Sequence, residues 1–423
     1  MSLPAKSKPW QQPIVLMGGL FFLFGFITWL NAALIPYLKL ACELTNLESY
    51  LVAFAFYISY FVMAIPSSWV LQRTHLKKGM VLGLLVMAVG TLLFLPAAYT
   101  RTYGLFLTGL FVTGTGLALL QTAANPYVTL IGPVDSAARR ISIMGICNKT
   151  AGAISPYVLG SVVLADADAW SARLPEASGA EREALLQALA LKVVPPYVLI
   201  TVALCALALW VRYSPLPDLE ADENETVGDP LPHRPSLLLY PHLVLGVVAL
   251  FFYVGAEVIA GDTIIAYGSS LGLPMSTAKT FTTFTLLAML AGYLLGVFTI
   301  PRYIRQEKFL LLSSALGLLL SVTALVTPPA LSVTCIALLG LANAIMWPAI
   351  WPLALSGLGR YTKLGSALLI MAIAGGALLP LLYGFLADRF GTQQAYVVLL
   401  PCYLVIFFYA FRGHKIHEWR NIG

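Results

Sequence analysis

Charged residues are scarce in this chain. Of its 423 residues only 10% are Asp, Glu, Lys or Arg, against about 25% in an ordinary soluble domain. With 59% hydrophobic residues, a soluble fold of this length could not cover its surface with polar side chains. A lipid bilayer solvates apolar side chains directly. The composition therefore predicts a polytopic membrane protein and excludes a soluble enzyme, a disordered chain and a coiled coil.

The sequence also lacks the signatures of bond-making chemistry. The cysteine count is five, an odd number, and no C-x-x-C or Cys/His ligand spacing occurs, so neither a disulfide framework nor a zinc site is expected. No Walker loop and no G-x-S-x-G motif is present, which argues against an enzyme and against ATP-driven transport. We expect no metal and no cofactor. The net charge of +6 does not indicate nucleic-acid binding, because the placement of charge matters more in a membrane protein than its sum.

Long apolar runs dominate the rest of the sequence. A membrane-spanning helix needs about 20 predominantly apolar residues. Twelve runs come close to this length, and they are too continuous for the alternating strands of a membrane barrel. The predicted spans are 14–38, 50–71, 80–98, 103–132, 141–164, 193–213, 243–268, 276–300, 309–327, 331–356, 364–387 and 394–411.

The positions of lysine and arginine predict the orientation. With the N-terminus inside, 17 of the 25 basic residues fall in inside segments and 7 in outside segments, while Lys149 lies within a span. Cytoplasmic loops of membrane proteins carry the excess of positive charge. Both termini are therefore expected in the cytoplasm.

Two polar stretches interrupt the pattern of spans. Residues 165–192 contain a short amphipathic segment and are expected on the outer side of the membrane. Residues 214–241 are acidic and proline-rich, and they are expected to form a cytoplasmic linker of low order because they have little apolar surface to bury. The chain then divides into an N-terminal six-helix half, 1–213, this linker, and a C-terminal six-helix half, 242–423.

Short motifs repeat between the two halves. The pattern Gly-x3-Pro-x3-Gly at 152–160 returns at 376–384, an offset of 224 residues, and Gly-Leu-Ala at 116–118 returns at the same offset. Phe-Phe-x-x-Gly occurs in spans 1 and 7, at 21–25 and 251–255. A six-plus-six duplication is the layout of the major facilitator fold, whose substrate site lies between the halves near the midplane. We therefore expect an all-α membrane protein of this fold, with twelve helices in two pseudo-symmetric halves.

Three ionisable residues lie deep within predicted spans: Lys149 in span 5, and Glu257 and Asp262 in span 7. Placing a charge in mid-span costs about 2.5–3.5 kcal/mol on insertion scales, so such residues mark functional sites by default. The two carboxylates are about 140° apart on a regular helix, although Gly261 would permit an irregular one. The alternative is an ion pair of Lys149 with one carboxylate that only fixes helix packing.

Uncharged polar residues form stripes along spans 4 and 10, and two more amides lie in spans 1 and 5. Amides that donate and accept hydrogen bonds, combined with flat aromatic faces, suit a neutral polyol or sugar. The alternative is that the amides only bridge neighbouring helices. The residues concerned are Asn31, Gln121, Asn125, Asn148, Asn343, Trp347 and Trp351.

Several segments resemble one transporter family. They read FFLFGFITWLNAALIPYLK in span 1, LLQTAANPYVTLIGP in span 4, RISIMGICNKTAGAISP in span 5, FYVGAEVIAGDTI in span 7 and LGLANAIMWPAIWPLALSGLG in span 10. A further segment, in span 11, reads GSALLIMAIAGGALLPLLYGFLADRFG. Together these segments are similar to the fucose/glucose/galactose:cation symporter family of the major facilitator superfamily. The resemblance covers about 14–411 and is greatest to the bacterial glucose/galactose branch, which includes N-acetylglucosamine transporters.

The resemblance carries over only some of the family's functional residues. Fucose:proton symporters have an Asp after the Asn of L-N-x-x-L-x-P, where this chain has Ala32, and a Glu before T-A-A-N-P, where it has Gln121. Asn125 and Asn148 match family positions near the sugar, and Glu257 matches the acid of Y-V-G-x-E-V. Both acids that the resemblance implies for proton movement are thus missing.

The acid missing from span 1 has a counterpart in span 7. At the offset of 230 residues between the Phe-Phe-x-x-Gly motifs, Ala32 lies opposite Asp262. We expect Asp262 to carry the cation coupling, with Lys149 as its partner, and Glu257 to act mainly as a sugar ligand and secondarily in coupling. The fixed charge of Lys149 would repel a second cation in a low-dielectric site, which favours a proton over sodium, or else facilitated diffusion.

Together these features predict a secondary transporter of the bacterial inner membrane. It is expected to import glucose, galactose or N-acetylglucosamine by proton symport with alternating access, working as a monomer among membrane lipids. Sodium coupling and uncoupled uniport are the alternatives within sugar transport. An exporter of drugs or metabolites and a non-transporting receptor are the alternatives outside it. The expected sugar ligands are Asn31, Gln121, Asn125, Asn148, Glu257, Asn343, Trp347 and Trp351.

Overall fold

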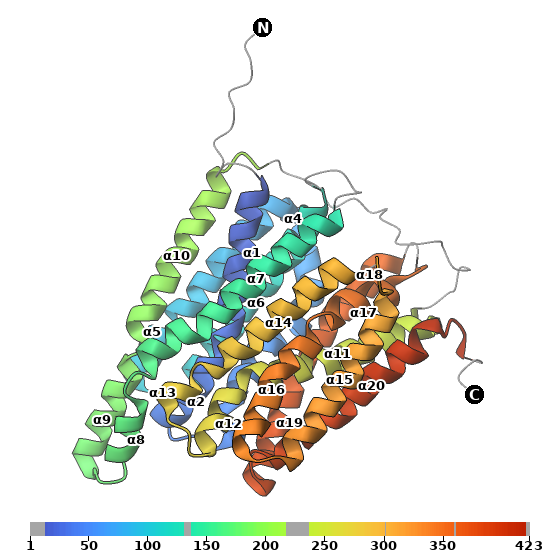
Figure 1. Cartoon of the computed structure of the whole chain (residues 1–423). Coiled ribbons are helices and arrows are strands. Elements are labelled where there is room, and N and C mark those ends of the chain that lie inside the picture. Colours follow the sequence, from blue (N-terminus) through green and yellow to red (C-terminus); the bar gives the residue numbers. More distant parts are fainter. Residues whose placement is uncertain (1–12, 131–136, 217–236, 301, 359–360, 420–423) are drawn as a thin grey trace.

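The computed structural model describes residues 13–130, 137–216, 237–300, 302–358 and 361–419. Figure 1 shows the N-terminal elements, blue to green, on one side of the molecule and the C-terminal elements, yellow to red, on the other. The N-terminal elements are α1 (Pro13–Trp29), α2 (Asn31–Ala41), α3 (Asn46–Ser49), α4 (Leu51–Leu92), α5 (Phe94–Thr100), α6 (Tyr103–Leu130), α7 (Ala137–Val163), α8 (Ala167–Arg173), α9 (Gly179–Leu191) and α10 (Val194–Tyr213).

The C-terminal half repeats this plan with more breaks. Its α-helices are α11 (Pro241–Asp262), α12 (Ile264–Ser270), α13 (Met275–Ala278), α14 (Phe281–Thr299), α15 (Gln306–Val326), α16 (Pro329–Asn343), α17 (Met346–Leu355), α18 (Thr362–Met371), α19 (Gly375–Phe390) and α20 (Leu399–Phe411). The described residues of this half also form four short 3₁₀ helices: η3 (Leu237–Leu239), η5 (Ala372–Ala374), η6 (Gln394–Val398) and η7 (Gly413–Lys415).

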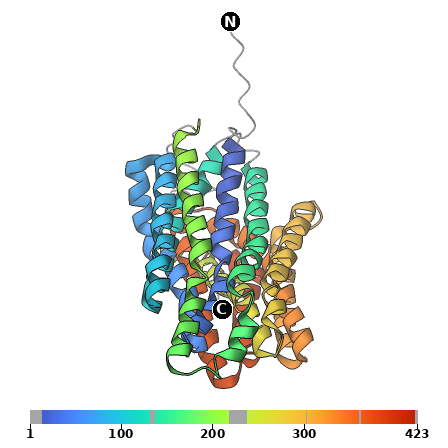
Figure 2. The same cartoon turned by 90° about the vertical axis from the view of Figure 1, so that its left-hand side faces the viewer.

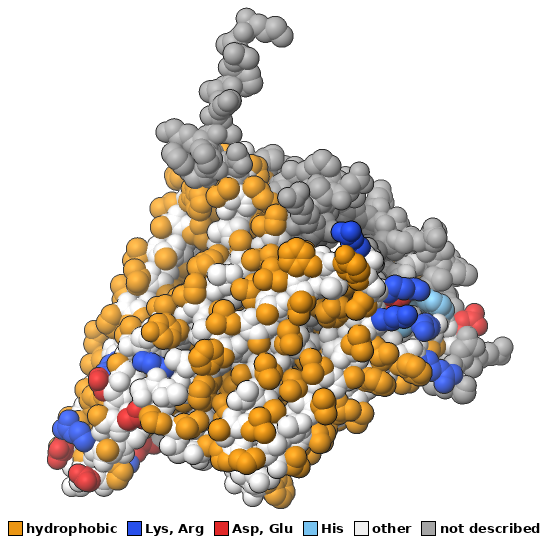
Figure 3. Space-filling model, in the orientation of Figure 1, with side chains coloured by type: hydrophobic (Ala, Val, Ile, Leu, Met, Phe, Trp, Pro, Cys, Tyr) orange, Lys and Arg blue, Asp and Glu red, His pale blue; other side chains and the backbone are white. Residues whose placement is uncertain are grey.

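The described helices confirm a multi-pass membrane protein of the expected fold class. Eleven helical stretches are long and apolar enough to cross a bilayer, and a twelfth is added if the bent pair Ile143–Val163 and Ala167–Arg173, 41° apart, forms one span. Large apolar side chains cover the outside of the bundle (Figure 3). The predicted linker falls mostly on 217–236, which lie outside the described residues.

The bundle has two distinguishable ends. The N-terminus of α1 and the C-terminal end of α20 lie at one end, which we call the terminal end. The helices α8 and α9 form a hairpin that projects at the opposite end, which we call the hairpin end (Figures 1 and 2). The expected amphipathic segment is therefore a helix, α9, outside the bundle of spans.

Glycines of the repeated motifs allow equivalent packing in the two halves. A Cβ on Gly25 would lie 1.8 Å from the backbone oxygen of Asn148, and one on Gly255 would lie 2.1 Å from Leu379. Each Phe-Phe-x-x-Gly motif thus lets the first span of its half pack closely on the fifth. The Gly-Leu-Ala repeat differs, because Gly116 packs on span 3 whereas Gly340 packs on span 8.

Candidate functional site

An ion pair joins the two halves in the middle of the bundle. Lys149 Nζ on α7 lies 2.9 Å from Glu257 Oε1 on α11, and each side chain is only 12% exposed. The expected pairing of Lys149 with Asp262 is therefore wrong in this structure. The helix α11 stays regular through Gly261 as far as Asp262, so the two carboxylates point in different directions and Lys149 reaches only one of them.

Trp29 packs against this pair from the end of α1. Lys149 Nζ lies 5.2 Å from the centre of the Trp29 ring, within the range of a cation–π contact. The indole is buried, with 2% exposure, between two glycines. A Cβ would lie 2.4 Å from the indole if built on Gly152 of α7, and 2.1 Å if built on Gly261 of α11. The two glycines thus form a slot that crosses the boundary between the halves.

Aromatic rings continue the site into the C-terminal half. Tyr253 lies one turn before Glu257 on α11 and is buried, and its ring centre lies 6.5 Å from that of Trp347. Trp347 and Trp351 stack with their centres 5.3 Å apart. Both belong to α17, which is separate from α16 because Pro348 has no N–H for the carbonyl of Ala344 and its ring crowds that carbonyl.

Asp262 is the last residue of α11 and is fully buried. Within the described residues, neither of its carboxylate oxygens has a hydrogen-bond partner. The helix breaks at the next residue, where the Thr263 hydroxyl donates to the carbonyl of Ile259 at 2.7 Å. Such bonding back to the preceding turn competes with the regular helix. An ionised carboxylate without a partner is costly in a dry interior.

Two predicted amides each bond to a neighbouring helix of the N-terminal half. Gln121 Nε2 donates to the hydroxyl of Tyr60 at 3.1 Å. Asn148, next to Lys149, donates through Nδ2 to the carbonyl of Phe21 at 3.3 Å. Asn125 lies one turn beyond Gln121 on α6. Gln121 is half-buried whereas Asn125 is exposed, so the two amides of the predicted stripe differ in their surroundings.

Two other predicted amides lie inside their own halves. Asn31 lines a cavity of about 10 Å³ with Thr91 and Thr113, enclosed by the N-terminal half; that volume is about the size of one water. Asn343 is buried and accepts a hydrogen bond from Tyr403 at 2.9 Å, which joins α16 to α20. For Asn343, the structure thus favours the interpretation that the amide bridges helices.

The sequence reasoning missed Tyr253 and the position of Trp29. The spacing of Tyr253 from Glu257, four residues on one helix, was a usable signal. The slot around Trp29 left no signal in the sequence, since its two glycines come from other helices. Within the part of the chain that the structure describes, no three His, Cys, Asp or Glu side chains gather as a metal site would require.

Comparison with known proteins agrees with this architecture. The family model of the Major Facilitator Superfamily matches residues 17–370. The chain is 36% identical to the glucose/galactose transporter of Brucella abortus, over 94% of this chain and 92% of that protein. It is 31% identical to the L-fucose-proton symporter of Escherichia coli K12, over 96% of this chain and 94% of that protein. A crystal structure of FucP, a Major Facilitator Superfamily transporter in the outward conformation, superimposes with a TM-score of 0.69 at 28% identity, over 94% of this chain and 97% of FucP.

Proposed function

The chain belongs to the Major Facilitator Superfamily, and from this premise we propose that it imports a neutral sugar across the bacterial inner membrane by alternating access. Glucose, galactose and N-acetylglucosamine are the proposed candidates. The names of the similar proteins, a glucose/galactose transporter and an L-fucose-proton symporter, support the sugar class. We propose that the protein works as a monomer surrounded by lipid.

One observation carries the proposal: a charged and aromatic cluster at the boundary of the halves, formed by Lys149, Glu257, Tyr253, Trp347 and Trp29. A hexose presents hydroxyl groups around an apolar ring face. Carboxylate, ammonium and phenol groups can satisfy the hydroxyls, which would otherwise cost about 1–3 kcal/mol each when buried without a partner. Indole faces can cover the apolar side of the ring. In this proposal Gln121, Asn125 and Asn148 supply further polar contacts, and Trp351 extends the aromatic face.

For Lys149 the proposal now differs from the first expectation, in which its partner was Asp262. Since Glu257 already neutralises Lys149, a sugar hydroxyl would insert beside an ion pair and could bond to both groups. The proposed coupling group remains Asp262, which takes no part in the ion pair. A buried carboxylate without a partner takes up a proton more readily than it stays charged, so a proton is the proposed coupling cation.

The orientation proposal places both termini and residues 214–241 in the cytoplasm. At the terminal end near the C-terminal half, Lys and Arg side chains outweigh the few acidic ones in view, whereas the two signs are mixed at the hairpin end (Figure 3). This asymmetry supports the positive-inside prediction. Labelling from outside sealed cells, at a cysteine introduced near position 225, would contradict it.

The test of the function is an uptake panel in proteoliposomes. Glucose, galactose, fucose and N-acetylglucosamine are each offered under a proton gradient, a sodium gradient and no gradient. We expect accumulation of one of the first two sugars or of N-acetylglucosamine under the proton gradient alone. Accumulation under sodium alone would overturn proton coupling, equilibration without accumulation would indicate a uniporter, and no transport of any sugar would overturn the proposal.

A further inference from the structure

Two carboxylates hold the halves together at the hairpin end. Asp388, at the end of α19, accepts hydrogen bonds from the backbone N–H groups of Asn46, at 3.1 Å, and Leu47, at 2.9 Å. Asp168, on α8, accepts from the N–H groups of Met275, at 2.8 Å, and Ser276, at 3.3 Å. Asp388 therefore reaches from the C-terminal half to α3, and Asp168 reaches from the N-terminal half to α13.

The two contacts are related by the internal repeat. Asn46 and Met275 are 229 residues apart, as are Leu47 and Ser276, close to the offset of 230 between spans 1 and 7. Each pair of N–H groups begins a four-residue helix that follows the first span of its half. The first N–H groups of a helix have no partner within the helix, and a carboxylate is their strongest acceptor. Each half thus presents the same donors to an acid of the other half.

Close packing accompanies both contacts. A Cβ on Gly160, from the repeated Gly-x3-Pro-x3-Gly motif, would lie 3.4 Å from the Cβ of Lys279, just after α13. The equivalent Gly384 lies against Tyr50, just after α3, where a Cβ would come within 2.6 Å of the ring. The repeated glycines therefore bring the halves together beside each carboxylate.

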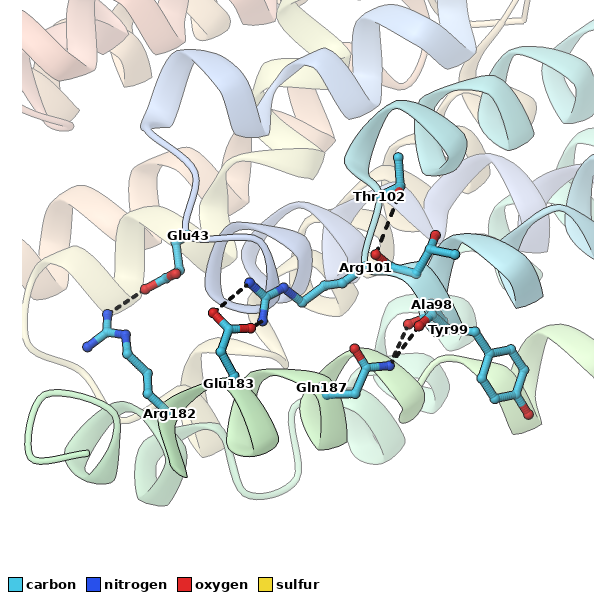
Figure 4. Close-up of polar contacts among 9 residues, drawn as sticks. Glu43, Ala98, Tyr99, Arg101, Thr102, Arg182, Glu183 and Gln187 are labelled. Carbon is cyan, nitrogen blue, oxygen red and sulfur yellow. Dashed lines mark hydrogen bonds and ion pairs between the residues drawn. The ribbon is translucent and has the colours of Figure 1, made fainter. Parts of the chain in front are cut away.

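The hairpin that carries Asp168 is fastened to its own half (Figure 4). Arg182 pairs with Glu43, and Glu183 pairs with Arg101 at 2.7 Å. Gln187 donates to the carbonyl of Ala98 at 3.0 Å. These contacts make α8 and α9 a fixed arm of the N-terminal half, so Asp168 can stay bonded to α13 only while the two halves are closed at this end.

We propose that Asp168 and Asp388 form a paired latch that holds the hairpin end closed and sets the balance between the two open states. The proposal rests on transport by alternating access, in which these contacts must break once in every cycle. Both carboxylates are exposed, so water replaces the lost hydrogen bonds when the latch opens. A polar latch of this kind stabilises closure while leaving it reversible.

The test measures opening directly and needs no sugar. In purified protein whose five native cysteines are replaced, Gly160→Cys places one thiol at the closed boundary, facing Lys279. Its labelling rate with a maleimide is proportional to the open fraction while that fraction is small. Adding Asp168→Asn with Asp388→Asn should raise the rate about tenfold, the factor equivalent to about 1.4 kcal/mol.

Matched controls separate the latch from general loosening. Asp166→Asn removes a nearby carboxylate that pairs with Lys192 of its own half, at 2.7 Å, and should leave the rate unchanged. Disulfide formation between Gly160→Cys and Lys279→Cys, whose Cβ separation is near the usual range of about 3.5–4.5 Å, checks that the latch variant still folds and closes. An unchanged labelling rate in the latch variant, or an equal rise for Asp166→Asn, would overturn the latch. Failure of sugar uptake alone would count against the proposed function and would not overturn the latch.

Discussion

Trp29 and Gly261 lie against each other across the boundary between the two halves. The indole fills the space where a side chain on Gly261 would begin, 2.1 Å from a Cβ built there. The same indole lies over Lys149, and Gly261 is followed directly by the buried Asp262. One rigid ring therefore contacts both the ion pair and the helix end that carries the proposed coupling acid.

Gly261→Ala should lower the stability of the closed arrangement and slow uptake. The added methyl group would overlap the indole, which has no free space to move into because Gly152 borders its other side. Overpacking of this kind costs about 1–3 kcal/mol. Thermal unfolding in detergent and the initial rate of sugar uptake are the two measurements.

Gly145→Ala is the matched control for Gly261→Ala. Gly145 lies on α7, two turns before Gly152, and a Cβ there would meet no heavy atom within 4 Å. Alanine is favoured over glycine inside a helix by about 0.5–1 kcal/mol. This variant should be as stable as the parent or slightly more so. Equal losses in both variants would show that the slot around Trp29 has no special role.

The ion pair should respond differently to single and double substitution. Lys149→Met or Glu257→Met alone leaves one buried charge unpaired, which costs about 3–5 kcal/mol. Replacing both with methionine removes the unpaired charge, and stability should return to near the parent value. If the pair also binds sugar, uptake should stay lost in the double variant. Recovery of both stability and uptake would instead show that the pair only fixes helix packing.

How far the sequence predicts the site depends on the kind of signal. The spans and the repeated glycines were predictable because apolar length and motif spacing are local properties. The partner of Lys149 was not, since two carboxylates lay within reach along one helix and only the position of α7 relative to α11 in the folded chain selects Glu257. Periodicity placed Asn343 and Trp347 on one stripe, yet Asn343 bonds to Tyr403 within its own half. A helical period tells which residues share a face and not which neighbour that face meets.

Gln121→Ala and Asn148→Ala should each weaken sugar binding at least about tenfold, about 1.4 kcal/mol per site. Their partners in this structure, Tyr60 and the carbonyl of Phe21, leave hydrogen-bonding capacity for a ligand, because each amide has two donors and two acceptor positions. Asn343→Ala is the comparison, since it should reduce stability through the lost bond to Tyr403 without changing affinity. Equilibrium binding of the transported sugar measures the first effect. Unchanged affinity in both amide variants would remove them from the pocket.

Asp262→Asn should uncouple transport from the proton gradient. The substitution keeps the size of the side chain and removes the group that can gain and lose a proton, while the Lys149–Glu257 pair stays intact. With an acidic exterior, the parent protein should accumulate sugar against its gradient, and the variant should only equilibrate it. Sugar exchange between the two sides needs no net proton movement and should continue in the variant at a similar rate.

The control is Asp166→Asn, which removes an exposed carboxylate at the hairpin end. This variant should still accumulate sugar like the parent. Full proton-driven accumulation by Asp262→Asn would show that another group carries the proton, and loss of exchange as well would place Asp262 in binding or folding.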